Sequence, residues 1–115
     1  MPHDPAFART PAPPYYAVIF TTRRTPGDHG YEAMAEHMAA LAATMPGYLG
    51  AESARDAQGV GITVSYWESE TAILNWKRNA EHAAARAQGR RDWYQHYELR
   101  VAKVERAYSL TNPAV

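Results

Sequence analysis

Hydrophobic residues in the first part of the chain follow two different periods. Residues 15–22, YYAVIFTT, are rich in aromatic and β-branched residues, a composition typical of a β-strand. Further on, apolar residues recur at intervals of three and four, the spacing of one helix face: they are Tyr31, Met34, Met38, Leu41 and Met45. Pro46-Gly47 ends this pattern, because proline cannot donate within a helix and glycine adopts the dihedrals found past its end. We predict a strand at 15–22 and a helix at about 29–45 whose apolar stripe packs on a sheet.

A β-hairpin is predicted in the middle of the chain. Residues 48–55 form a strand-like segment, and the four residues 56–59, DAQG, have the composition of a hairpin turn. In residues 60–67 apolar side chains alternate with small or polar ones, which is the period of a strand.

The segment from about residue 69 to 90 has a helical pattern. Ser69 is a suitable N-cap and Glu70 is favourable in the first turn. One continuous helix has an apolar face (Ile73, Trp76, Ala80, Ala83, Ala84, Ala87) and a polar face (Asn75, Asn79, His82, Arg86, Arg90). Asn79 is a second potential N-cap, so the helix is either continuous or divided in two there. Gly89 is expected to end it.

The last strand is expected at residues 94–108. Its alternation slips between Val101 and Val104, which suggests a bulge, and its length and charges suggest that it leaves its own sheet to pair elsewhere. The resulting order is β-α-β-β-α-β, a ferredoxin-like α+β fold. It predicts a four-stranded antiparallel sheet with helices on one face. We expect the bare face to be covered by a second copy, giving a homodimer through that face and the last strand.

Composition narrows the classes of protein. The chain has 115 residues, 46% of them apolar, with no cysteine and twelve basic against twelve acidic groups. This length supports one domain, predicted at 15–110, with a flexible proline-rich arm at 1–14 and a short tail at 111–115. A net charge of zero with no reader motif argues against nucleic acid. With neither a signal sequence nor a stretch of about 20 apolar residues, we expect a cytoplasmic protein that does not enter a membrane.

The order of elements and three local motifs resemble the antibiotic biosynthesis monooxygenase family. The motifs are Met45-Pro46-Gly47-Tyr48, the strand ITVSYW that ends at Trp67, and the helix opening ESE at 68–70. The likeness extends over about residues 15–110. The resemblance implies a dimeric α+β barrel with a pocket between sheet and helices in each protomer. It also implies chemistry drawn from cofactor-independent oxygenases of aromatic polyketides, haem-degrading enzymes and quinol-oxidising proteins.

The haem-degrading branch of that family is matched only in part. Its members have a haem-ligating histidine ten residues after the second tryptophan of a Trp-to-Trp pair. Trp67 and Trp76 match the pair, but the position ten residues beyond Trp76 is Arg86, and His82 lies six residues beyond it. The departure argues against that branch's mode of ligation.

His82 is the candidate catalytic base. In the first turn of a helix capped by Asn79 it would be kept neutral by the helix dipole, and neutral imidazole accepts protons from phenols. The substrate-binding candidates are aromatic walls and oxyanion-binding arginines: Trp67, Trp76, Arg86, Arg90, Trp93 and Tyr97. Each has a purely structural alternative, as core or as an ion pair to a glutamate. No metal-ligand spacing, phosphate loop or Gly-x-Gly-x-x-Gly occurs, so neither a metal nor a cofactor is predicted.

Two functions are compatible with this pattern. One is a cofactor-independent monooxygenase that acts on a small aromatic or quinol-type substrate. The other is a non-catalytic dimer that binds a small hydrophobe or haem, or that is purely structural.

Overall fold

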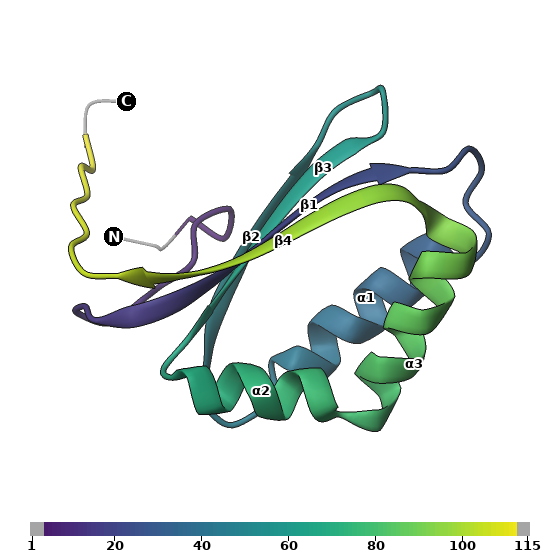
Figure 1. Cartoon of the computed structure of the whole chain (residues 1–115). Coiled ribbons are helices and arrows are strands. Elements are labelled where there is room, and N and C mark those ends of the chain that lie inside the picture. The colour runs from purple at the N-terminus through teal and green to yellow at the C-terminus, as the bar shows by residue number, and fades with distance from the viewer. Residues whose placement is uncertain (1–3, 113–115) are drawn as a thin grey trace.

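The computed structural model describes residues 4–112 as one four-stranded antiparallel sheet covered on one face by helices (Figure 1). The elements in chain order are β1 (Tyr15–Arg24), α1 (Tyr31–Ala42), β2 (Tyr48–Arg55), β3 (Val60–Trp67), α2 (Glu70–Arg78), α3 (Ala80–Gln88), a π-helical turn η1 (Gly89–Trp93) and β4 (Tyr94–Val104). The strands lie in the order β2-β3-β1-β4. The predicted ferredoxin-like fold is confirmed, with the second helix divided in two. No helix within residues 4–112 is long and apolar enough to cross a bilayer.

The two faces of the sheet follow from strand alternation. Val18 packs against the buried cluster of Ala42, Trp67 and Ala72, so alternate residues of β1 from Val18 face the helices. Directly opposite residues in an antiparallel pair share a face, which places Trp67 on this helix-side face as well, opposite Tyr16. The remaining residues of each strand form the open face, which no helix covers. Ile62 lies there and is 47% exposed.

The apolar stripe of α1 is the buried side of that helix. Its members are half-buried, in a helix whose other side chains are mostly exposed. Met45, just past the helix, packs against the Trp67 cluster, whereas Met34 and Met38 line a groove between α1 and α3. The stripe therefore faces both the core and the neighbouring helix, because α3 lies beside α1 (Figure 1).

The last strand corrects three predictions. Instead of leaving its sheet, β4 pairs with β1 along its length, from Tyr94 opposite Arg24 to Val104 opposite Tyr15. The strand stops at Val104 rather than at residue 108. Its bulge falls near its start, where the register shifts beside Arg23 and Arg24, and not between Val101 and Val104. A ten-residue β1 offers one whole edge for pairing, and an edge strand tolerates charged side chains because they reach solvent.

The helical stretch also extends further than predicted. Gly89 lies inside it with right-handed helical dihedrals, because the chain continues through the π-turn to Trp93 before β4 begins.

The described part of the N-terminal arm bonds to the open face. The Ala8 amide donates to Glu52 Oε2 at 3.0 Å, and the Thr10 hydroxyl donates to the Tyr15 hydroxyl at 3.1 Å. Tyr66 donates to Glu52 Oε1 at 2.6 Å, and burial together with this carboxylate raises the pKa of Tyr66 to about 12. Residues 1–3 of the predicted arm and 113–115 of the predicted tail lie outside the described residues.

Candidate functional site

The break between α2 and α3 positions the candidate histidine. Ser69 Oγ accepts from the Ala72 amide and caps α2, as the sequence predicts. At Asn79 the backbone turns away from helical geometry (ψ 129°), and its Oδ1 accepts from the amides of Glu81 and His82 at 3.0 and 3.1 Å. The alternative of a divided helix is thus the correct one. The faces drawn for a continuous helix do not hold beyond Asn79, where Ala85 is the buried residue of α3.

Three rings form a stack at this break. The Trp76 indole lies 6.1 Å from the Trp67 ring at an interplanar angle of 25°. The His82 imidazole lies 4.0 Å from Trp76 at 9°, nearly parallel. Trp67 is fully buried and donates from Nε1 to Ser65 Oγ at 2.9 Å. The core thus anchors one end of the stack and holds His82 at the other.

The tautomer of His82 follows from the partner of its Nδ1. Nδ1 lies 3.0 Å from the Trp76 carbonyl oxygen, and because a carbonyl can only accept, Nδ1 carries the hydrogen. The neutral ring then has its lone pair on Nε2. Burial lowers the pKa of His82, the Arg86 charge lowers it further, and the bond to Trp76 partly opposes both. His82 therefore combines a fixed orientation with a neutral, basic Nε2 near pH 7.

Arg86 adjoins the same break. Its Nη2 donates to the Lys77 carbonyl at 3.2 Å, while its Nε is buried with no partner among the described residues. The structural alternative of an ion pair to a glutamate is not realised at Glu81, which instead bonds His37 at 3.0 Å. One N–H of Arg86 is thereby left without an acceptor beside the histidine.

The other predicted site residues lie elsewhere. Trp93 is buried, donates to the His29 carbonyl at 2.9 Å and packs edge-on against Tyr31. Tyr97 is 37% exposed, with its ring 5.3 Å from Phe20. Arg90 is exposed in η1. The structure therefore unites Trp67, Trp76, His82 and Arg86, and separates from them Trp93, Tyr97 and Arg90.

The helices leave part of the helix-side face uncovered along β4. Leu99 and Val101 point to this face, opposite Phe20 and Val18, yet remain 52% and 48% exposed. Val18 in turn packs against the Trp67 cluster. An accessible apolar strip thus adjoins the core that carries the ring stack.

A separate cluster of tyrosines and arginines was not anticipated from the sequence. Arg24 lies over the Tyr31 ring at 3.6 Å, and Arg55 lies at 5.5 Å from the same ring. Tyr94 is a hydrogen-bond partner of Tyr31. We call these four residues the Tyr–Arg cluster. They come from β1, α1, β2 and β4. Their spacing in the sequence does not predict that these side chains are in contact.

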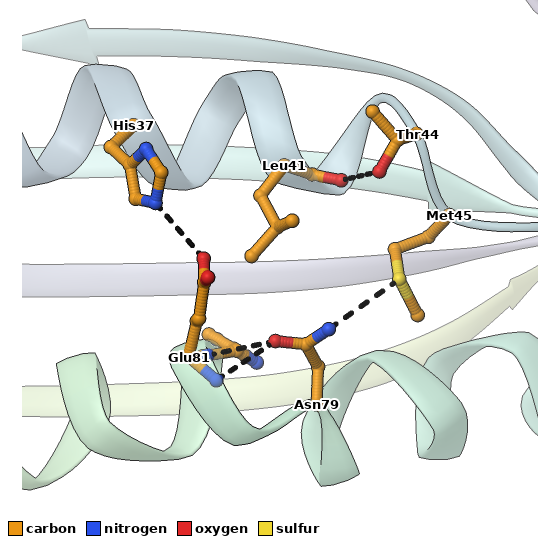
Figure 2. A network of polar contacts seen from close by, with 7 residues as sticks. His37, Leu41, Thr44, Met45, Asn79 and Glu81 are labelled. Carbon is orange, nitrogen blue, oxygen red and sulfur yellow. Dashed lines mark hydrogen bonds and ion pairs between the residues drawn. The ribbon is translucent and has the colours of Figure 1, made fainter.

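An apolar groove of about 180 Å³ runs between α1 and α3. It is lined by Met34, His37, Met38, Glu81, Ala84, Ala85 and Gln88. The His37–Glu81 bond crosses from one helix to the other, and Asn79 Nδ2 approaches the Met45 sulfur at 3.9 Å (Figure 2). His82 is not among the groove's lining residues. Within residues 4–112 no three histidine or acidic side chains are grouped as metal ligands.

Comparison with known proteins gives matches at the level of both sequence and fold. The profile of a family described as antibiotic biosynthesis monooxygenase matches residues 14–88. The uncharacterized protein YqjZ of Bacillus subtilis is 54% identical over 99 residues, which are 86% of this chain and 87% of YqjZ. The jasmonate monooxygenase ABM of Pyricularia oryzae is 30% identical over 94 residues, 77% of this chain but only 43% of that protein.

A solved structure shares the fold at low identity. SnoaB, a cofactor-independent oxygenase from Streptomyces nogalater, superimposes with a TM-score of 0.68 at 13% identity, over 88% of this chain and 99% of SnoaB.

Proposed function

The chain belongs to the antibiotic biosynthesis monooxygenase family, and we propose that it is a cofactor-independent monooxygenase of a small aromatic or quinol-type substrate. The observation that carries the proposal is the oriented, neutral imidazole of His82, which is stacked through Trp76 on the core residue Trp67. The Nδ1 of His82 is held by the Trp76 carbonyl and the pKa of His82 is lowered by burial, which leaves Nε2 as a base. The accessible apolar strip along β4 adjoins the same core through Val18.

The chemistry needs only the substrate, oxygen and a base. Nε2 removes a proton from an activated C–H beside a phenol or ketone, and the resulting anion is electron-rich enough to transfer an electron to O₂. In the net reaction a methylene loses two hydrogens and gains one oxygen atom, and the second oxygen atom leaves as water. The substrate supplies all the electrons. The protein's task is to position, deprotonate and exclude water.

Two relatives support the oxygenase class. One match is to a protein named as a jasmonate monooxygenase, and one shared fold is that of a cofactor-independent oxygenase. The identities with them are 30% and 13%, so the substrate is argued from the site itself. The stacked Trp67, Trp76 and His82 rings favour a flat, conjugated substrate, because such a molecule can extend the stack.

Oxygen uptake tests the function. The purified protein, free of added metal or flavin, is expected to consume one O₂ per molecule of an anthrone and to give an anthraquinone and water. With a simple quinol, one O₂ per molecule would give the quinone and hydrogen peroxide. Rates should exceed those of buffer and of boiled protein. A rate equal to that of buffer with every anthrone and quinol tried would contradict the oxygenase. Retention of a small hydrophobe, or a Soret band after haem addition, would then support the binding function.

A homodimer is part of the proposal. Exposed apolar side chains such as Ile62 lie on the helix-free face, and the same face of a second copy would bury them in a two-fold dimer. The interface is expected to exceed about 2,000 Å². Light scattering at micromolar concentration should give twice the 12.8 kDa of the chain. A mass of one chain would rule the dimer out.

A further inference from the structure

The Tyr–Arg cluster lies far from the ring stack. On β3, Gly61 pairs with Arg55 and Thr22, whereas Trp67 lies six residues further along the strand. Six residues of strand extend about 20 Å. A small molecule at the cluster does not reach Trp67, so the cluster is a separate place on the helix-side face.

Arg55 is held rigidly, and no carboxylate of the described residues 4–112 pairs with it. Its Nη1 donates to the Gly59 carbonyl at 2.9 Å, and its Nη2 donates to the hydroxyls of Thr22 and Tyr31 at 3.2 and 3.1 Å. Two of its five N–H groups remain for another acceptor. The guanidinium lies directly on the backbone of Gly61, where an added Cβ would come within 2.5 Å of Nη2. Glycine at this position therefore makes the close approach of Arg55 possible.

The nearby carboxylates are engaged elsewhere. Asp56 Oδ1 accepts from the amides of Gln58 and Val60 in the hairpin turn. Asp28 accepts from the amides of Gly30 and Glu32 at the start of α1. These bonds hold the turn and the helix start, and neither acid forms an ion pair with Arg24 or Arg55 within residues 4–112.

A second cation strengthens the positive field. Arg24 donates to the carbonyls of Trp93, Gly27 and Asp28, which fixes its guanidinium 3.6 Å above the Tyr31 ring. The ring face attracts the cation and keeps it at this position. Two arginines thus lie against one phenol with no anion of the described chain between them. Such an arrangement favours an anion.

Aromatic rings also lie beside the Tyr–Arg cluster. Phe20 lies 5.5 Å from Tyr94 and 5.3 Å from Tyr97, and Tyr97 is partly exposed, so the cluster is open to solvent on the β4 side. The bulge near the start of β4 puts Tyr94 and Tyr97 on the same face. Burial raises the pKa of Tyr94, and so does Tyr31, so its hydroxyl remains a donor at neutral pH.

We propose that Arg55, with the hydroxyls of Tyr31 and Tyr94, forms a binding site for the carboxylate of a small aromatic acid. The guanidinium and the Tyr31 hydroxyl donate to the carboxylate, while the Tyr94 hydroxyl donates to Tyr31 and orients it. The rings of Phe20, Tyr94 and Tyr97 hold the aromatic body. The site stands independently of the oxygenase chemistry, because binding there requires no turnover. The competing explanation is that Arg55 only braces the β2–β3 hairpin through Gly59.

Calorimetric titration with 1-naphthoate and its neutral amide separates the two explanations. The parent protein is expected to bind 1-naphthoate with a Kd below about 1 mM and the amide at least about tenfold more weakly. Arg55→Met should weaken binding of 1-naphthoate by about tenfold or more. Tyr94→Phe removes one hydroxyl and keeps the ring, and should weaken it about fivefold.

Arg23→Met is the matched control. Arg23 precedes Arg24 on the same strand, points to the open face and is exposed. Arg23→Met should change the affinity for 1-naphthoate by less than about twofold, because salt screens the effect of an exposed charge on the other face of the sheet. If Arg55→Met is too unstable to titrate, the Tyr94→Phe and amide results decide. Equal affinity for acid and amide, unchanged binding in Tyr94→Phe, or no binding by the parent would overturn the site.

Discussion

Replacing His82 with alanine is expected to lower turnover of the oxidised substrate by about a hundredfold or more, the usual contribution of a general base. His82 is the side chain whose orientation, lowered pKa and free Nε2 suit it for this role. The loss should appear in kcat under oxygen saturation, measured by oxygen electrode. Unchanged turnover would remove His82 from the chemistry and leave the acidity of the substrate to drive the reaction.

Two variants separate proton transfer from positioning. In His82→Asn the amide can still donate to the Trp76 carbonyl but cannot take a proton, so turnover should fall as far as in His82→Ala. His37→Ala is the matched control, because His37 is exposed and its one side-chain bond among residues 4–112 is to Glu81 on the adjacent helix. It should keep the parent's rate. A partial rescue by asparagine would indicate that His82 acts by holding Trp76 in place.

The pH profile gives an independent test of the same base. Because the pKa of His82 is lowered from 6.5, the neutral form predominates at neutral pH and is lost only as pH falls through the lowered value. Turnover should therefore have an acidic limb below about pH 6.5. The limb should be absent from the residual activity of His82→Ala.

Replacing Trp67 with alanine is expected to cost about 3–5 kcal/mol of unfolding free energy, since the side chain is fully buried and a cavity remains. For a domain whose total stability is about 5–15 kcal/mol, this is a large share of the whole. The indole contacts Tyr48 edge-on at 5.4 Å and stacks on Trp76. Its loss therefore also removes the ring that supports Trp76 and, through it, His82. Urea unfolding followed by circular dichroism measures the change in unfolding free energy.

Leu74→Ala is the control for Trp67. Leu74 is 41% exposed on α2, and its truncation should cost less than about 1 kcal/mol. Both variants are compared at one protomer concentration, because dimerisation would couple stability to concentration. A loss in Trp67→Ala no larger than in Leu74→Ala would show that the core is not organised around this indole.

Much of the fold could be predicted because local signals agreed with one another. The period of the α1 stripe, the alternation in residues 60–67 and the cap at Ser69 each depend on a few neighbouring residues. Backbone hydrogen-bond geometry sets those periods wherever the residues occur. The sequence predicts Asn79 as a potential cap, but a cap and a continuous helix are both compatible with the local residues, so the sequence leaves both alternatives open.

The last strand shows the opposite case. Its composition predicts a strand, which is confirmed, but the predictions of its pairing partner and of the position of its bulge are wrong. Pairing depends on which strand edge is free. In this sheet β3 pairs with one edge of β1, and the other edge of β1 is the one that pairs with β4.

The sequence by itself determined the elements, their order and thereby the family fold, because periodicity and capping are properties of adjacent residues. It also named Trp67, Trp76 and His82 as candidates. Only the tertiary structure decided that these three form one stack, that Trp93 and Tyr97 lie elsewhere, and that Arg55 meets Tyr31 and Tyr94. Such contacts join strands and helices far apart in the chain, and they are set by how the layers pack rather than by any spacing along it.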